Sequence, residues 1–141
     1  MRRLFYPGTD VVLVFFDTTC RDSFEALEYE WIPEKLNWLP DIPWILVGTK
    51  SDLLYDTTCE DTKGTVPVKQ QDITALCKKY NFEYFETSAI TGDGVEACLF
   101  AAAAAGVAFK YGKNNIPLVL KINVLENGMT RLKCFHDLLT E

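Results

Sequence analysis

Three polar side chains that could together recognise a flat, nitrogen-rich ring follow an apolar run in the first half of the chain. The run covers residues 44–47, Gly48 ends it, and Thr49, Lys50 and Asp52 come next. A carboxylate in such a place can accept two hydrogen bonds from a ring with adjacent N–H groups, as guanine has, while a lysine stem lies along the ring face. The same residues also suit an ordinary polar loop between a strand and a helix. The cluster alone leaves both interpretations open.

The elements around this cluster predict where it lies. An apolar run of this length bounded by glycine is typical of a strand buried on both faces, although a short buried helix can look similar. In an open α/β sheet, ligands bind in the crevice beyond the carboxyl ends of the strands. We therefore expect residues 48–52 to lie at such an edge.

A second cluster of polar and small residues follows the next predicted strand, residues 82–86. Thr87, Ser88, Ala89 and Ile90 come directly after it. Together, the two clusters resemble the two base-recognition loops of the Ras superfamily of GTPases.

Other motifs make the resemblance more specific, and they are similar to the Rho family within that superfamily. They are the threonine in place of asparagine before Lys50, and two further groups of residues: Tyr6, Pro7, Thr9, Asp10, Trp31, Pro33 and Glu34. The resemblance covers about residues 4–110. It implies a partial Ras-like P-loop NTPase fold, binding of GTP and GDP with Mg²⁺, GTP hydrolysis in signalling, and protein regulators and effectors as partners.

By this resemblance, six residues would bind guanine: Thr49, Lys50, Asp52, Ser88, Ala89 and Ile90. Asp52 would accept hydrogen bonds from the ring, and the stem of Lys50 would stack on it. The turn formed by Ser88, Ala89 and Ile90 would present a backbone N–H to the base.

The phosphate-binding half of the family pattern is missing from this sequence. There is no G-x-x-x-x-G-K-[ST] motif, since the nearest match, from Gly106 to Asn114, has five residues between its glycines and ends in asparagine. The family's switch threonine and its Asp-x-x-Gly-Gln segment are absent as well. We therefore expect no catalytic residues and no Mg²⁺ ligands in this chain, and base recognition alone.

This loss predicts weak nucleotide binding. Two hydrogen bonds from Asp52 would contribute about 3–6 kcal/mol, and a dissociation constant of about 1 mM corresponds to about 4 kcal/mol. We expect nucleotide affinity near millimolar at best, and no GTP hydrolysis by this chain alone. Two other interpretations stay open: a non-catalytic protein-interaction module, and an incomplete product of a longer reading frame.

Length, charge and cysteine content narrow the class of protein to which this chain can belong. The chain has 141 residues, 48% of them hydrophobic, and a formal net charge of −6, which suits one acidic domain with no basic surface for nucleic acid. Its five cysteines are odd in number and form no C-x-x-C pair, as is typical of reduced thiols in the cytoplasm. We expect these cysteines to be small buried hydrophobes, and Trp31, Trp38 and Trp44 to lie in the core.

The remaining elements follow from periodicity. Residues 11–16 predict a strand, and Asp22, with Glu25 three residues later, predicts the N-cap of a helix that Pro33 divides in two. Helices are expected over 69–80 and 95–110.

Together these elements predict three parallel strands with flanking helices. Residues 53–66 read as a surface loop. In the family, the strand that matches residues 11–16 lies beside one that this sequence lacks. We therefore expect its edge to be exposed, as a site of aggregation or partner binding.

The C-terminal part departs from the family. We interpret residues 1–111 as a partial small-GTPase domain and residues 112–141 as an extension. Segments 118–125 and 129–135 flank Asn127 and Gly128, a strong hairpin signal, although an unrelated extension fits as well. Since no C-terminal C-a-a-X box is present, we expect no lipid anchor.

Overall fold

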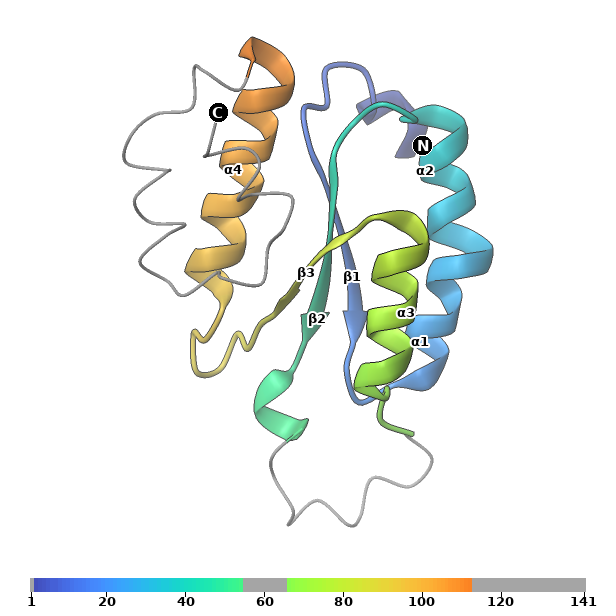
Figure 1. Cartoon of the computed structure of the whole chain (residues 1–141), viewed down its shortest axis with the longest axis vertical. Coiled ribbons are helices and arrows are strands. Elements are labelled where there is room, and N and C mark those ends of the chain that lie inside the picture. The colour runs from blue at the N-terminus through green and yellow to red at the C-terminus, as the bar shows by residue number, and fades with distance from the viewer. Residues whose placement is uncertain (1, 55–65, 113–141) are drawn as a thin grey trace.

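The computed structural model describes residues 2–54 and 66–112, which form a three-stranded sheet between two layers of helices (Figure 1). In chain order the elements are η1 (Arg2–Phe5), β1 (Val12–Asp17), α1 (Arg21–Ala26), the π-helical segment η2 (Leu27–Trp31), α2 (Ile32–Trp38), β2 (Trp44–Thr49), η3 (Ser51–Leu54), α3 (Gln70–Tyr80), β3 (Glu83–Glu86) and α4 (Val95–Tyr111). The predicted α/β class and the three predicted strands are confirmed.

The sheet is parallel and has the order β1-β2-β3. Its middle strand, β2, is buried from Ile45 to Gly48, as expected for a strand covered on both faces. In the register, Asp17 lies beside Thr49, and Gly48 lies beside Glu86. The carboxyl ends of all three strands therefore meet at one edge.

Two apolar cores lie on opposite faces of the sheet. Phe16 and Leu46 pack with the helices α1 to α3, whereas Val47 and Phe85 pack with α4. Successive side chains of a strand point to opposite faces, so neighbouring residues of β2 belong to different cores. Figure 1 shows the same division, with α4 on one side of the sheet and α1 to α3 on the other.

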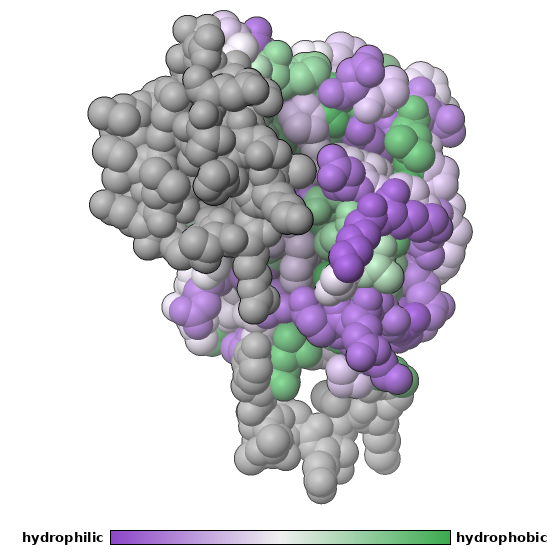
Figure 2. All heavy atoms as spheres, in the orientation of Figure 1, coloured by the Kyte–Doolittle hydropathy of each residue, from purple (hydrophilic) through white to green (hydrophobic). Residues whose placement is uncertain are grey.

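The two helical layers differ in the polarity of their side chains. In Figure 2, hydrophilic residues gather over α1 to α3, where α3 buries Ile73 and Leu76 and exposes Lys78 and Lys79. Helix α4 instead is rich in alanine and buries Ala101 and Ala104 against the sheet.

The first long helix differs from its prediction at two positions. Asp22 is not the N-cap, because the helix begins at Arg21 with Cys20 in the capping position and no side-chain cap bond. The helix is divided into two α-helical segments as expected, but the division lies ahead of Pro33: the π-helical segment η2 separates α1 from α2, and Pro33 is in the first turn of α2. A π-helical turn changes the backbone hydrogen bonding ahead of the proline, which lacks an N–H.

The tryptophans divide between core and surface. Trp31 and Trp44 are partly buried and pack against the core of the α1 to α3 face, as predicted. Trp38, at the end of α2, is 49% exposed, so its prediction was wrong. Cys98 is buried, whereas Cys20 and Cys77 are only partly buried.

Strand β1 is an edge strand of the sheet, and its side chains are less buried than those of β2. Within the described residues it pairs only with β2, and Phe15 is 55% exposed. A groove of about 560 Å³ runs beside it, lined by β1, the segment before it and α2. The hydroxyl of Tyr6 donates to Oε1 of Glu34 at 2.6 Å there, so two motifs that resemble the Rho family contact each other.

Some predictions lie outside the described residues. They concern the extension after residue 112, with its hairpin over 118–125 and 129–135, and most of the surface loop over 53–66. In the part that is described, none of the helices has the length and apolar character needed to cross a membrane.

Candidate functional site

The two polar clusters lie next to each other at the carboxyl edge of the sheet. The first begins at Thr49, the last residue of β2, and continues into η3, and the second follows β3. Backbone hydrogen bonds join them: the N–H of Thr87 donates to the carbonyl of Gly48 at 2.8 Å, and that of Ser51 to the carbonyl of Thr87 at 3.1 Å. The parallel pairing of β2 and β3 therefore brings the two loops together.

A side-chain hydrogen bond connects the clusters directly. The hydroxyl of Ser88 donates to Oδ1 of Asp52 at 2.5 Å. The hydroxyl oxygen of Ser88 in turn accepts from the backbone N–H groups of Ile90, at 3.3 Å, and Thr91, at 3.2 Å. Ser88 is fully buried. It fixes the Asp52 carboxylate against the turn, and the carboxylate still has lone pairs for ligand donors.

The turn after β3 is closed by its own backbone. The N–H of Gly92 donates to the carbonyl of Ser88 at 2.9 Å, and the N–H of Ser88 donates to the carbonyl of Asp93 at 3.0 Å. Ala89 and Ile90 lie at the outside of this turn, where Ile90 is 85% exposed.

A pocket of about 550 Å³ opens between the two clusters. This volume is within the range of about 300–1,000 Å³ that is usual for small-molecule sites. Five of the six predicted guanine-binding residues line it: Thr49, Lys50, Asp52, Ala89 and Ile90. Ser88 does not line it but contacts Asp52, which does. Apolar side chains complete its wall, among them Leu13, Phe15 and Leu99.

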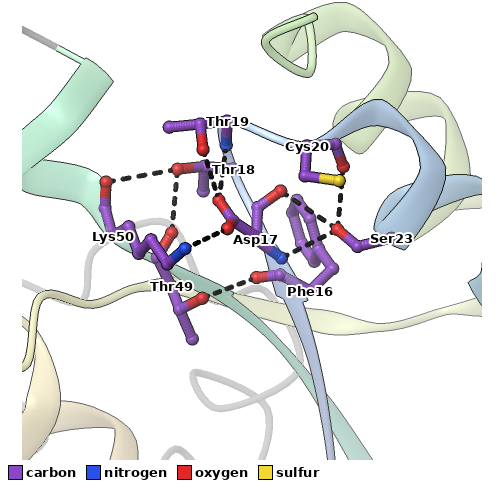
Figure 3. Close-up of polar contacts among 8 residues, drawn as sticks. All are labelled: Phe16, Asp17, Thr18, Thr19, Cys20, Ser23, Thr49 and Lys50. Carbon is purple, nitrogen blue, oxygen red and sulfur yellow. Dashed lines mark hydrogen bonds and ion pairs between the residues drawn. The ribbon is translucent and has the colours of Figure 1, made fainter. Parts of the chain in front are cut away.

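Lys50 is held in an uncommon conformation (Figure 3). Its φ of 60° is in the left-handed region, which few residues other than glycine adopt. Its Nζ lies 2.5 Å from Oδ2 of Asp17, at the end of β1. Burial by itself would raise the pKa of Asp17, but the hydrogen bonds from Lys50 and Thr19 outweigh it and hold the pKa below its ordinary value.

Thr49 contacts the neighbouring strand. Its hydroxyl donates to the carbonyl of Phe16 at 3.0 Å. The side chain therefore links β2 to β1 while the residue also lines the pocket.

Among the residues of this site that sequence reasoning missed are Phe15, Asp17 and Thr18. All three belong to β1 or the turn after it, and Phe15 lines the pocket while Asp17 and Thr18 contact Lys50. A signal was present, because the segment from Asp17 to Thr19 follows an apolar strand just as the first cluster does.

The arrangement of these residues can recognise a ligand. The pocket offers one carboxylate, one lysine stem and apolar walls, which suit a flat ring with N–H donors. Over residues 2–54 and 66–112, no three His, Cys, Asp or Glu side chains lie together as a metal site would need.

The family model and the individual relatives that match this chain belong to the same group of proteins. The family model that matches is that of the Ras family, over residues 1–107. The human Rho-related GTP-binding protein RhoB is 34% identical over 119 residues, which are 82% of this chain and 61% of RhoB. The Rho-related protein racE of Dictyostelium discoideum is 38% identical over 104 residues, 72% of this chain and 47% of racE. The chain thus spans less than two thirds of the length of these relatives.

Proposed function

This chain belongs to the Ras family of small GTPases, with Rho-related proteins among its relatives, and we propose that its pocket binds the guanine base of GTP and GDP. The observation that carries the proposal is the 2.5 Å hydrogen bond between Ser88 and Asp52. It joins the two clusters into a single wall with a fixed carboxylate.

The pocket supplies both kinds of contact that a guanine ring needs. Asp52 can accept from two neighbouring ring N–H groups, which adenine does not present in that arrangement. Lys50 and the apolar residues of the wall provide surface for the ring faces. Guanine nucleotides should therefore bind better than adenine nucleotides.

The proposal extends to recognition of the base and no further. Each hydrogen bond to the Asp52 carboxylate would contribute about 1.5–3 kcal/mol. Without a G-x-x-x-x-G-K-[ST] motif to hold phosphates, this places the dissociation constant near millimolar. Base recognition through a carboxylate requires no metal ion.

The test is a titration followed by NMR, on a sample first shown to be folded. GDP, GTP and ATP are compared at millimolar concentrations, with and without Mg²⁺. We expect weak binding of GDP and GTP that does not depend on Mg²⁺, and weaker binding of ATP. Asp52→Ala should weaken GDP binding at least about tenfold, which corresponds to the loss of one hydrogen bond to a charged group.

The matched control is Asp41→Ala. Asp41 is an exposed aspartate in the turn before β2, at the opposite end of that strand. This variant should bind GDP like the unchanged protein. Equal binding of GDP and ATP, or equal losses in the two variants, would contradict the proposal. Binding of a protein partner that is unaffected by Asp52→Ala would instead favour an interaction module.

A further inference from the structure

The stem of Lys50 is fixed at both of its ends, and the residues that fix it come from β1 and the turn that follows. At the charged end, Nζ pairs with Oδ2 of Asp17 at 2.5 Å. At the backbone end, the hydroxyl of Thr18 lies 3.4 Å from the carbonyl of Lys50 and donates to the carbonyl of Thr49 at 2.8 Å. Figure 3 shows Lys50 lying across this turn.

Asp17 is the rigid member of the ion pair. Its other oxygen, Oδ1, accepts from the N–H of Thr19 at 2.9 Å and from the hydroxyl of Thr19 at 2.7 Å. The side chain of Asp17 is 21% exposed, whereas that of Lys50 is 56% exposed. The carboxylate is therefore held by its own turn, and the lysine reaches toward it.

An ion pair that is partly exposed to solvent contributes little to the free energy of folding. Its effect on the pocket is different, because Lys50 belongs to the pocket wall. A lysine with a free ammonium group samples many rotamers and loses them when a ring packs against its stem. A lysine whose two ends are already held has fewer rotamers to lose when the ring binds.

We propose that Asp17 is a positioning residue for guanine recognition, which holds the stem of Lys50 as a flat wall of the pocket before the base binds. This inference rests on the proposed function of the pocket. It adds a residue outside both polar clusters, contributed by a different strand.

Asp17→Asn is the variant that tests it. Asparagine keeps an oxygen that can accept the two bonds from Thr19, but it loses the charge that pairs with Lys50. We expect GDP to bind about 2- to 10-fold more weakly, because one long side chain must then be ordered on binding. The melting temperature should change little.

A double-mutant cycle separates positioning from general stability. Lys50→Met keeps a long stem and removes the ammonium group. If Asp17 acts through Lys50, adding Asp17→Asn to Lys50→Met should weaken GDP binding no further. The matched control is Glu25→Gln, which removes another ion-paired carboxylate, 2.9 Å from Arg21 on α1, and should leave GDP binding unchanged.

The outcomes distinguish the inference from the proposed function. If the unchanged protein binds no GDP, both are wrong. If it binds GDP and Asp17→Asn binds equally well, only the inference is wrong. The inference also fails if Asp17→Asn retains its full effect in the Lys50→Met background, or if the single variant does not fold, since Asp17 would then be structural.

Discussion

Replacing Gly94 by alanine should destabilise the fold at the junction of β3 and α4. Gly94 is the N-cap of α4, and its φ of 70° is in the left-handed region. A Cβ added there would lie 1.9 Å from the carbonyl oxygen of Glu86, the last residue of β3. Since that oxygen belongs to the backbone, no side-chain rotation can relieve the clash.

Two contributions set the magnitude. An alanine in the left-handed region costs about 1–2 kcal/mol relative to the right-handed one. Moving the start of α4 away from Glu86 resembles overpacking of a tight interior, which costs about 1–3 kcal/mol. Gly94→Ala should therefore lose about 2–5 kcal/mol, a large part of the roughly 5–15 kcal/mol that stabilises a typical domain.

Gly106→Ala is the matched control in the same helix. Gly106 is buried within α4, and a Cβ there would lie 3.6 Å from Cβ of Asp10 and 3.7 Å from a methyl group of Val11, which are ordinary contacts. Alanine is favoured over glycine inside a helix by about 0.8–1 kcal/mol. We expect this variant to be as stable as the unchanged protein or slightly more so.

Urea unfolding followed by circular dichroism measures both variants against the unchanged protein. The expected order of stability is Gly106→Ala, the unchanged protein, then Gly94→Ala. The reasoning would be refuted if Gly94→Ala lost less than about 1 kcal/mol, or if the two variants were equally destabilised.

Two further predictions concern buried and half-buried polar groups. Burial raises the pKa of Glu83 from 4.5 to about 7, and its Oε1 has no hydrogen-bond partner among the described residues. The folded protein thus holds this proton more tightly than the unfolded one, so stability falls by about 3 kcal/mol as the pH rises from 4.5 through 7. Glu83→Gln should remove that fall, and parallel pH profiles of unfolding free energy for the two proteins would contradict it. Tyr6→Phe loses the 2.6 Å hydrogen bond to Glu34 and should cost about 1–2 kcal/mol in urea unfolding, whereas an unchanged midpoint would show that water replaces the bond.

The sequence was sufficient for the framework of the sheet. The apolar runs over 11–16 and 44–47 correspond to β1 and β2, and the predicted strand over 82–86 corresponds to β3. The burial of β2 on both faces was predicted from its unbroken apolar character. Such patterns are local, so they can be read along the chain.

Local signals were less reliable at helix boundaries and on the surface. Asp22 was predicted to be the N-cap, but Ser23 hydrogen-bonds to the backbone of Asp17 and Cys20, and the N-cap is Cys20, two residues earlier. Trp38 was predicted to lie in the core because its side chain is large and apolar, but it lies at an exposed helix end. In both cases the tertiary arrangement overrode the propensity of a single residue.

By itself, the sequence determined which loops follow the strands, and therefore that Lys50, Asp52 and Ser88 belong to the carboxyl edge of the sheet. Only the tertiary structure decided how they meet. Ser88 bonds Asp52 across 36 residues of chain, and Asp17 reaches Lys50 from a neighbouring strand. Contacts of this kind depend on strand register and backbone direction, as in the left-handed turn at Lys50, and no spacing along the chain specifies them.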